Sequence, residues 1–384
     1  MRDLKECREA IDAIDSSILK LFKERMDVAC DIAAYKLSKN QGITDAKREM
    51  DKLKALRKIG DKLGLHGDFI SDVYKQIMSH TCAYERQYIL SKINSIDFNL
   101  TTSVAYLGDK GSYSYLAAHQ YLGGYKGGIE ALGCQSFDDI VNAVETGLCH
   151  YGVLPIENSS SGSINEVLDA LQKTKAVFVG EHYVNIDHAV LGCEHIGLSE
   201  ITDIYSHPQP FSQCSSWIKE LLPHATVHYC KATSEAMQIV SKKHNKTHVA
   251  IGSHLAGSLY NLIPLADNIA NNIHNYTRFV VISMTQVSIP ENLSAKTSLS
   301  FSVQKYIPGS LISVLNEFSK AKLNLTKLIS RPRLIQGRDT WEEIFFADIE
   351  ANIAAPVMQE ILDKIKGYTS SIKILGCYIN ADKH

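Results

Sequence analysis

A hydroxyl and a guanidinium stand next to each other at the start of an apolar segment in the second half of the chain. Thr277 and Arg278 precede Phe279–Ser283, whose β-branched residues predict a buried strand. A strand needs neither group for stability where it enters a core. A guanidinium binds carboxylates as a planar fork, and a hydroxyl can both donate and accept a proton. The pair predicts a site for an anion that also exchanges a proton, and a structural salt bridge is the alternative role for Arg278.

Further polar groups follow other apolar runs of the same region. The stretches read LGDKGSYSYLAA (107–118), LPIENSSSG (154–162) and YSHPQPFSQC (205–214). In open α/β sheets, ligands bind where the parallel strands end. The neutral donors and acceptors at these ends therefore suit the orientation of a polar ring substrate; they are Asn158, Ser159, Ser160, Ser206 and Gln213.

Two residues of these stretches are candidates for a general acid. Glu157 fits this role if burial keeps its carboxyl group protonated. His207 is the rival, because the ordinary pKa of a histidine side chain lies close to neutral pH. His207 lies between Ser206 and Pro208 in a tight turn, which favours a bracing role. The loop from Gly108 to Gly111 fits either a carboxylate-binding backbone or a plain turn.

The N-terminal stretch contains cations at positions where apolar residues are expected. Arg25 interrupts an apolar seam, and a buried arginine is costly unless it meets an anion. Lys36 follows eleven residues later, about three helical turns, so it points the same way. Arg8 lies about 25 Å of helix before Arg25. If both arginines bind one small ligand, one of them must come from another subunit.

Two more groups of polar residues belong to the same region. Arg48 and Glu49 follow Asp45 by three and four residues, so the three side chains share a helix face. They fit either the ligand site or a surface salt-bridge cluster. Thr81 and Glu85 share a face of a later helix for the same reason.

The helices and strands that must position these residues belong to three regions of the chain, which differ in composition. Residues 1–92 predict three helices, over about 4–35, 44–63 and 68–90, with a break at Asn40-Gln41-Gly42. The first helix carries an a/d seam with period 3.5: Leu4, Cys7, Ile11, Ile14, Ile18, Leu21, Arg25, Val28, Ile32 and Tyr35. Three helices cannot bury so long a seam alone, which predicts a partner chain.

In the other two regions, predicted strands alternate with predicted helices. Residues 103–285 predict a β/α alternation with a mainly parallel sheet. Residues 294–384 predict a βαββαβ order, the ferredoxin-like plan. The segments 91–102 and 288–296 are the expected linkers.

The helical unit resembles the all-helical chorismate mutase family. The resemblance is carried by Arg8, Arg25, Lys36, Asp45, Arg48, Glu49 and a polar residue at position 85. It implies an interlocked dimer that rearranges chorismate to prephenate. Arg8 of the partner subunit, Arg25 and Arg48 would hold carboxylates, while Lys36 and residue 85 would address the ether oxygen, where negative charge builds. Many family members have glutamine there, so Glu85 would need its proton to donate.

The α/β unit resembles prephenate dehydratase. Thr-Arg-Phe at 277–279 and the three polar stretches occur in the family's order. The resemblance implies a two-lobed fold like that of periplasmic binding proteins, with prephenate bound in the cleft and converted to phenylpyruvate. Thr277 would bond to the departing hydroxyl, and Arg278 would hold the side-chain carboxylate. The whole chain thus resembles the bifunctional chorismate mutase–prephenate dehydratases.

The C-terminal unit resembles the ACT domain of that family. PGSLISVL (308–315) and LISRP (328–332) correspond to its two phenylalanine-binding stretches. The resemblance implies feedback inhibition by phenylalanine held between paired domains, and it assigns to the effector site Gly309, Ser310, Leu311, Ile312, Ser330, Arg331 and Pro332. Gly309 permits close backbone approach or simply opens a helix. Ile329 stands where the family usually has a glutamate.

Composition excludes several classes of function. The 384 residues include 40 Lys and Arg against 42 Asp and Glu, so a basic footprint for nucleic acid is absent. No apolar run approaches the ~20 residues that span a membrane, and the charged N-terminus has no signal-peptide core. Nine cysteines without a Cys-x-x-Cys spacing predict reduced thiols in a cytoplasm and no metal site. No nucleotide-binding motif is present, and neither reaction needs a cofactor.

Two alternatives to a bifunctional homodimer or larger homo-oligomer remain open. A binding-protein fold with an ACT domain also suits a non-catalytic amino-acid sensor, and a second possibility is that only one activity survives. Thr277, Glu157 and the arginine set favour catalysis. Formation of phenylpyruvate from chorismate by the purified protein would distinguish the three.

Overall fold

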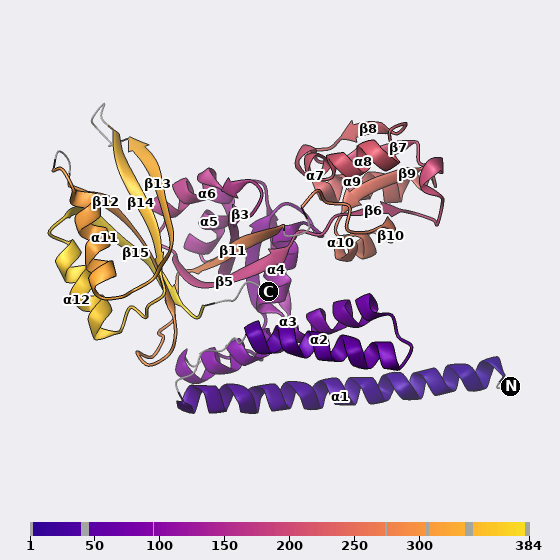
Figure 1. The fold of residues 1–384 in the computed structure, drawn as a ribbon, viewed down its shortest axis with the longest axis horizontal. Helices are drawn as coiled ribbons and strands as arrows, with labels where there is room; N and C mark the ends of the chain where they lie inside the picture. Colours follow the sequence, from indigo (N-terminus) through magenta and orange to yellow (C-terminus); the bar gives the residue numbers. More distant parts are fainter. Residues whose placement is uncertain are drawn as a thin grey trace.

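The computed structural model describes residues 3–39, 46–94, 96–272, 275–304, 307–334 and 341–380. Within these ranges, three helices come first, two α/β lobes follow, and four strands with two helices, which extend the sheet of the first lobe, come last (Figure 1). None of the helices in the described part combines the length and the apolar character that a membrane span requires.

The N-terminal helices are α1 (Leu4–Lys39), α2 (Ala46–Lys62) and α3 (Gly67–Asn94). Only the second half of α1 is buried in the chain, at Ala29 and Ala33. Most of the seam predicted for its first half is exposed, with Ile11 at 57% and Ile14 at 58%. Figure 1 shows the N-terminal end of α1 reaching beyond α2 and α3. The predicted apolar seam therefore lacks a cover within one chain.

A first α/β lobe follows the helices. Its strands are β1 (Thr102–Leu107), β2 (Ile129–Cys134), β3 (Tyr151–Asn158), β4 (Gly162–Ser163), β5 (Val177–Asn185) and β11 (Tyr276–Ser283), and its helices are α4 (Tyr113–Leu122), α5 (Phe137–Glu145) and α6 (Asn165–Lys173). The main order is β2-β1-β3-β11-β5, in which β1, β2 and β3 are parallel and β11 is antiparallel to both neighbours. The start of β11 therefore lies beside the end of β3.

A second lobe is inserted between β5 and β11. Its strands are β6 (Ala189–Gly192), β7 (Asp203–Ser206), β8 (Thr226–Tyr229), β9 (His248–Gly252) and β10 (Ile263–Ala266); its helices are η1 (Leu198–Glu200), α7 (Pro208–Gln213), α8 (Ser215–Leu221), α9 (Thr233–Lys243) and α10 (His254–Leu259). The order is β10-β6-β9-β7-β8, again with parallel and antiparallel pairs. The prediction of one mainly parallel sheet is wrong, because the chain crosses between two mixed sheets.

The C-terminal unit comprises β12 (Lys296–Val303), α11 (Ser310–Lys320), β13 (Leu325–Leu334), β14 (Trp341–Ile349), α12 (Pro356–Ile365) and β15 (Thr369–Tyr378). Its order is the βαββαβ order expected from the sequence, and its strands lie as β13-β14-β12-β15. β15 continues onto β5 through Gly376 and Phe178. Residues of both units, including Val280, Phe346 and Tyr378, share one hydrophobic cluster. The C-terminal unit is thus joined to the first lobe by strand pairing and by a shared hydrophobic core.

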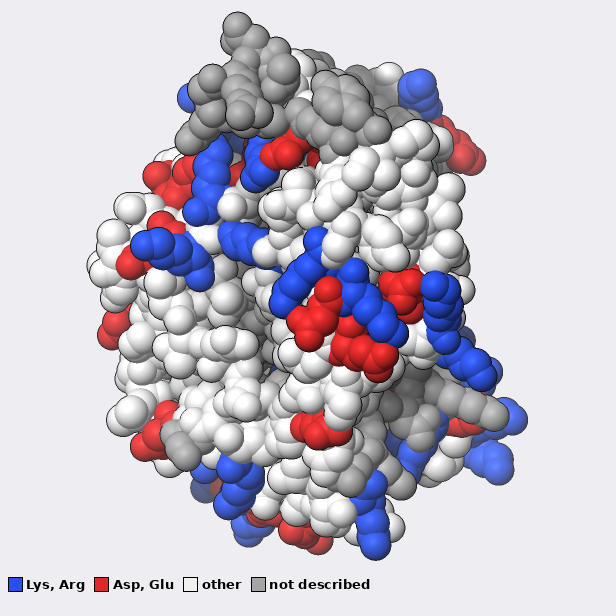
Figure 2. Space-filling model, turned by 90° about the vertical axis from the view of Figure 1, so that its left-hand side faces the viewer, with Lys and Arg blue, Asp and Glu red and all other residues white. Residues whose placement is uncertain are grey.

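The surface of the C-terminal side carries charges of both signs. On the described part of the face in Figure 2, basic and acidic side chains are interspersed. Helices α11 and α12 contribute short-range pairs such as Lys320–Glu317 and Lys364–Glu360. Such mixed charges give no long basic stripe on this part of the face.

Candidate functional site

The first candidate site lies where the three N-terminal helices meet. Lys36 of α1 and Glu85 of α3 form an ion pair, with 2.8 Å between Nζ and Oε2. Glu85 is 6% exposed, and the Arg25 guanidinium donates to the Thr81 hydroxyl one turn earlier on α3. The structure therefore brings together four of the residues predicted for this site.

Helix α2 closes the same site with residues of both charges. Glu49 accepts a hydrogen bond from the Cys82 thiol at 3.4 Å, which joins α2 to α3. Burial, aided by Glu49 and Glu85, raises the pKa of Cys82 to about 12, so this thiol is inert at neutral pH.

Lys52 is a residue of this site that the sequence argument missed. Burial lowers its pKa, and so do the positive charges of Arg25 and Arg48. Its spacing of four residues from Arg48 is the signal that would have placed it on the same helix face. Three cations from two helices consequently face one region, which suits a ligand with more than one carboxylate.

Arg8 is not brought to this site within one chain. Arg8 is exposed, and because α1 is one continuous helix, about 25 Å separate it from Arg25. Asp45 lies outside the described residues. Arg48 lies at the start of α2 and is exposed.

The second candidate site is built on the neighbouring ends of β3 and β11. Thr277 pairs with Asn158 across the two strands, and the Asn158 amide donates to the Thr277 hydroxyl at 2.9 Å. The same amide donates to the Asn275 side chain at 2.9 Å. Asn158 and Thr277 are 6% and 8% exposed. Because β11 is antiparallel to β3, the Thr277 hydroxyl at the start of β11 lies beside the end of β3.

A serine turn encloses this pair. The side-chain oxygen Oδ1 of Asn158 accepts from the backbone N–H groups of Ser160 and Ser161, at 2.9 and 3.0 Å. The Ser159 hydroxyl accepts from the Tyr276 backbone at 3.0 Å. The turn leaves the side chains of Ser159 and Ser160 exposed beside the buried Thr277. Asn275, which precedes Thr277 by two residues, is part of this network, and the sequence argument did not assign it a role.

Gln213 belongs to a second network, at the crossing between the two lobes. Its side-chain oxygen lies 2.7 Å from His188 Nε2, and His188 Nδ1 lies 3.2 Å from the hydroxyl of Tyr113, at the start of α4. Burial lowers the pKa of His188, which favours the neutral ring. The two networks meet through the backbone, since Ile186 donates to the carbonyl of Asn275 at 2.7 Å. Gln213 is therefore connected to the Thr277 network through His188 and Ile186, neither of which was predicted from the sequence.

Ser206 and His207 have local structural roles. Ser206 is fully buried, and its hydroxyl donates to the carbonyl of His207. His207 caps α7 by accepting from the backbone of Gln209 at 3.2 Å. The bracing role expected for His207 is confirmed by this cap.

Arg278 corrects the prediction that it holds a substrate carboxylate. Successive side chains of a strand point to opposite faces, so Arg278 points away from Thr277. Its guanidinium is 2% exposed and contacts Glu181 at 2.7 Å, Asp348 at 2.5 Å and the Tyr378 hydroxyl at 3.0 Å. The structural salt bridge, the alternative that the sequence left open, is what is observed.

Glu157 is corrected for the same reason. It pairs with Arg278 across β3 and β11, so it lies on the face opposite Asn158. Its carboxylate forms an ion pair with Lys327 of β13 and lies 3.6 Å from the Arg278 guanidinium. Two cations contact the Glu157 carboxylate on the face away from the Thr277 network. The role of general acid therefore has no support in this arrangement.

The residues predicted to bind phenylalanine lie on two elements. Gly309 opens α11 with φ of +83°, a conformation that favours glycine, and Ser310, Leu311 and Ile312 follow it. The second stretch lies on β13, an edge strand, and there Arg331 pairs with Asp169 of α6. Within the described residues, the two stretches form no hydrogen bond or ion pair with each other.

The two candidate sites differ in chemistry. The helical site combines several cations with Glu85 and suits the binding of an anion and the stabilisation of developing negative charge. The α/β site offers neutral hydroxyls and amides, which orient a polar substrate. Among the described residues, no three His, Cys, Asp or Glu side chains gather as metal ligands.

Comparison with known families assigns two parts of the chain. Residues 7–86 match the family "Chorismate mutase type II", and residues 104–287 match the family "Prephenate dehydratase".

Two relatives match nearly the whole chain. Both are named bifunctional chorismate mutase/prephenate dehydratase. The protein of Buchnera aphidicola subsp. Schizaphis graminum is 38% identical over 377 residues, 98% of this chain and 96% of its own length. The protein of Escherichia coli K12 is 38% identical over 371 residues, 97% of this chain and 95% of its own.

A solved structure shares the fold of the larger part. It is a prephenate dehydratase from Arthrobacter aurescens in complex with L-Phe. It matches with a TM-score of 0.65 at 24% identity and covers 73% of this chain and 91% of its own.

Proposed function

Since this chain belongs to the family of bifunctional chorismate mutase/prephenate dehydratases, we propose that it catalyses two consecutive steps of phenylalanine biosynthesis. It rearranges chorismate to prephenate and then converts prephenate to phenylpyruvate, under feedback inhibition by phenylalanine. The observation that carries the assignment is that each catalytic region keeps its own polar cluster, one cationic and one neutral. A non-catalytic sensor would need neither.

The mutase reaction uses the helical site. Chorismate carries two carboxylates, and negative charge builds on its ether oxygen as the C–O bond breaks. Arg25 and Arg48 hold the carboxylates, and Lys36 and Glu85 lie together at the position for the ether oxygen. Charge that develops in the transition state is stabilised best by donors already in place. Thr81, Asp45 and Glu49 complete the binding set.

The mutase site is completed by a partner subunit. The exposed apolar seam of α1 supports an interlocked homodimer, and the distance between Arg8 and Arg25 supports a site to which the partner lends its arginine. Pairing of the C-terminal units would likewise bring a Gly309 stretch next to a Ser330 stretch.

The dehydratase reaction uses the network around Thr277. Prephenate loses its ring carboxylate as carbon dioxide, and the bonding electrons enter the ring and expel the hydroxyl, which leaves as water after taking a proton. Thr277 and Asn158 bond to the departing hydroxyl, while Gln213, Ser159 and Ser160 orient the ring. A threonine is too weak an acid to supply a full proton alone, so its role is positioning.

Feedback acts through the joint between the C-terminal unit and the first lobe. The ion pairs of Lys327 with Glu157 and of Asp348 with Arg278 connect β13 and β14 to the strands that carry Asn158 and Thr277. Phenylalanine bound near Gly309 and the Ser330–Pro332 stretch would shift these strands. The L-Phe complex of the Arthrobacter aurescens protein of the same fold supports a phenylalanine site in such a chain.

A cytoplasmic location completes the proposal. All nine cysteines are free, and most are buried without a partner cysteine, which suits a reducing compartment.

The experiment that tests the assignment follows both products from chorismate in the full-length protein. The variant Thr277→Val removes the hydroxyl at nearly constant volume. We expect the rate of phenylpyruvate formation to fall about 10- to 100-fold, which corresponds to the loss of one strong hydrogen bond. Prephenate formation should continue, because Thr277 is remote from the helical site.

Thr277→Ser is the matched control, since it keeps the hydroxyl and should retain most of the dehydratase activity. Loss of both activities in folded Thr277→Val protein would contradict the assignment of two separate sites.

A further inference from the structure

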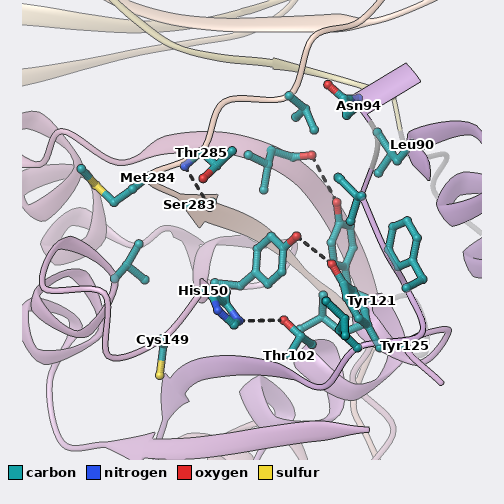
Figure 3. A pocket seen from close by; sticks show the side chains of 18 of the residues that line it. Leu90, Asn94, Thr102, Tyr121, Tyr125, Cys149, His150, Ser283, Met284 and Thr285 are labelled. Atoms are coloured by element: carbon teal, nitrogen blue, oxygen red, sulfur yellow. Dashed lines mark hydrogen bonds between the residues drawn. The ribbon is translucent and has the colours of Figure 1, made fainter. Parts of the chain in front are cut away.

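A cavity lies between helix α3 and the first α/β lobe, apart from the residues proposed for catalysis or feedback (Figure 3). Its volume of about 640 Å³ falls in the range of small-molecule sites. Its walls come from α3, the loop before β1, helix α4, the end of α5 with the loop that follows it, the start of β3 and the segment that follows β11. None of the residues assigned above to chorismate, prephenate or phenylalanine lines it.

Helix geometry keeps this cavity distinct from the mutase site. Glu85 points to α1, where it pairs with Lys36. Arg86 and Gln87 follow at rotations of about 100° each, and both line the cavity. One helix therefore presents the mutase site on one face and the cavity on another.

Aromatic side chains form one wall of the cavity. The rings of Phe98 and Tyr125 are 4.6 Å apart between centroids, and the ring of Tyr125 lies edge to face with that of Tyr151 at 6.3 Å. The hydroxyls of Tyr125 and Tyr151 are hydrogen-bonded at 2.8 Å, and the Tyr121 hydroxyl donates to the carbonyl of Val179. Figure 3 shows these bonds around the open space. Rings fixed in this way offer a preformed surface to a planar apolar group.

Two side chains of the cavity, Arg86 and Gln87, offer hydrogen-bond donors. Gln87 is 7% exposed, and its buried Nε2 has no hydrogen-bond partner. The Arg86 guanidinium lies 4.9 Å from the ring centroid of Tyr121 and forms no ion pair with any carboxylate in the described ranges. A buried amide without a partner is costly, so a ligand acceptor would relieve it.

The acidic residues at the cavity wall are occupied by neighbours. Asp97 accepts from the backbone and side chain of Asn99, both at 2.9 Å. Glu145 accepts from Thr174 and from the backbone of Lys175. Both residues are also exposed to solvent, whereas Arg86 is half-buried, so the charge that lies against the tyrosine rings is the Arg86 guanidinium.

We propose that this cavity binds a small aromatic carboxylate, with its ring against the tyrosines and its carboxylate on Arg86 and the Gln87 amide. The guanidinium and the unpartnered amide supply donors for the two carboxylate oxygens, and the aromatic wall excludes a purely polar anion. An aromatic amino acid fits less well, because its ammonium group would face Arg86. This site goes beyond the proposed function, and its existence does not depend on either reaction.

The test is calorimetric titration of the full-length protein with 3-phenylpropanoate, which has the ring and the carboxylate but no ammonium group. Arg86→Gln should weaken binding about tenfold or more, the loss of a charge-assisted hydrogen bond. Lys92→Gln is the matched control, because Lys92 is also a cation on α3 above a tyrosine ring, at 5.4 Å from Tyr88, and it does not line the cavity. Its affinity for the probe should equal that of the unmodified protein.

A second variant keeps the test decisive if Arg86→Gln does not fold. Gln87→Met removes an amide that has no partner, so thermal stability should be retained while probe affinity falls several-fold. Phenylpyruvate and L-phenylalanine are then tested as competitors of 3-phenylpropanoate. Phenylpyruvate should displace the probe more strongly than L-phenylalanine does. Equal affinities in the Arg86, Gln87 and Lys92 variants would overturn the proposal. Loss of probe binding in Thr277→Val alone would also overturn it, because the probe would then occupy the dehydratase site.

Discussion

Glu85 illustrates how a single charge determines what the helical site can do. It forms an ion pair with Lys36 at 2.8 Å, and in the proposed mutase reaction its carboxylate would lie where negative charge develops on the ether oxygen. A carboxylate opposes that charge, whereas a carboxylic acid or an amide can donate to it. Lys36 is meanwhile partly engaged by Glu85 and is less available to the substrate.

The substitution Glu85→Gln replaces this carboxylate with a permanent donor. We expect the mutase kcat/KM of the variant to be equal to or higher than that of the unmodified protein at neutral pH. Dehydratase activity should be unchanged. The measurement is kcat/KM for chorismate at neutral pH, and a lower value in the variant would show that the Glu85 carboxylate does not oppose charge on the ether oxygen.

Arg278 has a structural role that its neighbour Thr277 lacks. Its guanidinium contacts Glu181, Asp348 and Tyr378, all buried. Removal of one partner of a buried pair costs about 3–5 kcal/mol, because the other charges are left unpaired. Arg278→Leu should therefore lower the free energy of unfolding by an amount of that order.

Arg331→Leu is the control for Arg278→Leu, since its partner Asp169 is 45% exposed and the pair should contribute about 1 kcal/mol or less. Denaturant unfolding of both variants gives the comparison. If Arg278→Leu kept its stability and instead raised the KM for prephenate, the role of carboxylate ligand would be restored.

At the scale of elements, the crossing between the two lobes depends on a buried histidine. His188 joins Gln213 of the second lobe to Tyr113 of the first. Burial lowers its pKa from the ordinary value of 6.5. The folded state thus binds fewer protons than the unfolded state, and the stability linked to His188 is present above pH ~6.5 and is lost as pH falls through the lowered pKa.

The substitution His188→Gln removes this titration while it keeps a hydrogen-bonding side chain. The free energy of unfolding should fall more gently below pH ~6.5 in the variant, by up to about 1.4 kcal/mol per pH unit. His195→Gln, at an exposed position, should leave the pH profile unchanged. Identical profiles for the variant at position 188 and the unmodified protein would exclude His188 as the group responsible.

The sequence predicts the elements well where local pattern determines them. The three N-terminal helices, the βαββαβ order and the strand at Phe279–Ser283 all follow from periodicity and turn residues. The direction of β11 does not, because antiparallel insertion between β3 and β5 is a long-range pairing. Strand direction and alternation decide that Thr277 and Asn158 share a face while Arg278 and Glu157 share the other.

The same difference between local pattern and long-range pairing applies to the candidate sites. Residues that meet along one helix face, such as Thr81 and Glu85, are recognisable from spacing alone. Asn275, His188 and Tyr113 come from separate segments, and only the crossing of the chain between two lobes brings them together. Lys52 has the right spacing from Arg48, but a lysine on an exposed helix is too common to single out.

At the scale of the whole molecule, the parts are not independent. One sheet passes from β2 to β13 through the pairing of β5 with β15. The residues Ala33 and Ile89 of the helical region share a cluster with Phe279 and Cys377. A ligand bound to the C-terminal unit can therefore act on β3 and β11 without a flexible linker between them.

The last prediction concerns the assembly of the mutase site from two chains. Arg8 and Arg25 lie on one continuous helix, about 25 Å apart, so they cannot contact one small substrate within a subunit. The exposed side chains of Leu4, Ile11 and Ile14 on the same helix are 57–69% exposed, a surface that another chain would cover. We therefore expect each site to combine Arg25 of one subunit with the arginine at position 8 of the other.

Mixing two inactive variants tests this arrangement. Arg8→Ala and Arg25→Ala homodimers should each lose most mutase activity, since every site lacks one cation. After denaturation and joint refolding at equal amounts, about half of the dimers should be mixed, and each mixed dimer contains one site with both arginines. Mutase activity should then recover to roughly a quarter of that of the unmodified protein, while dehydratase activity serves as the internal control for refolding. If mixing restores no mutase activity although dehydratase activity returns, the two arginines do not share a site across the interface.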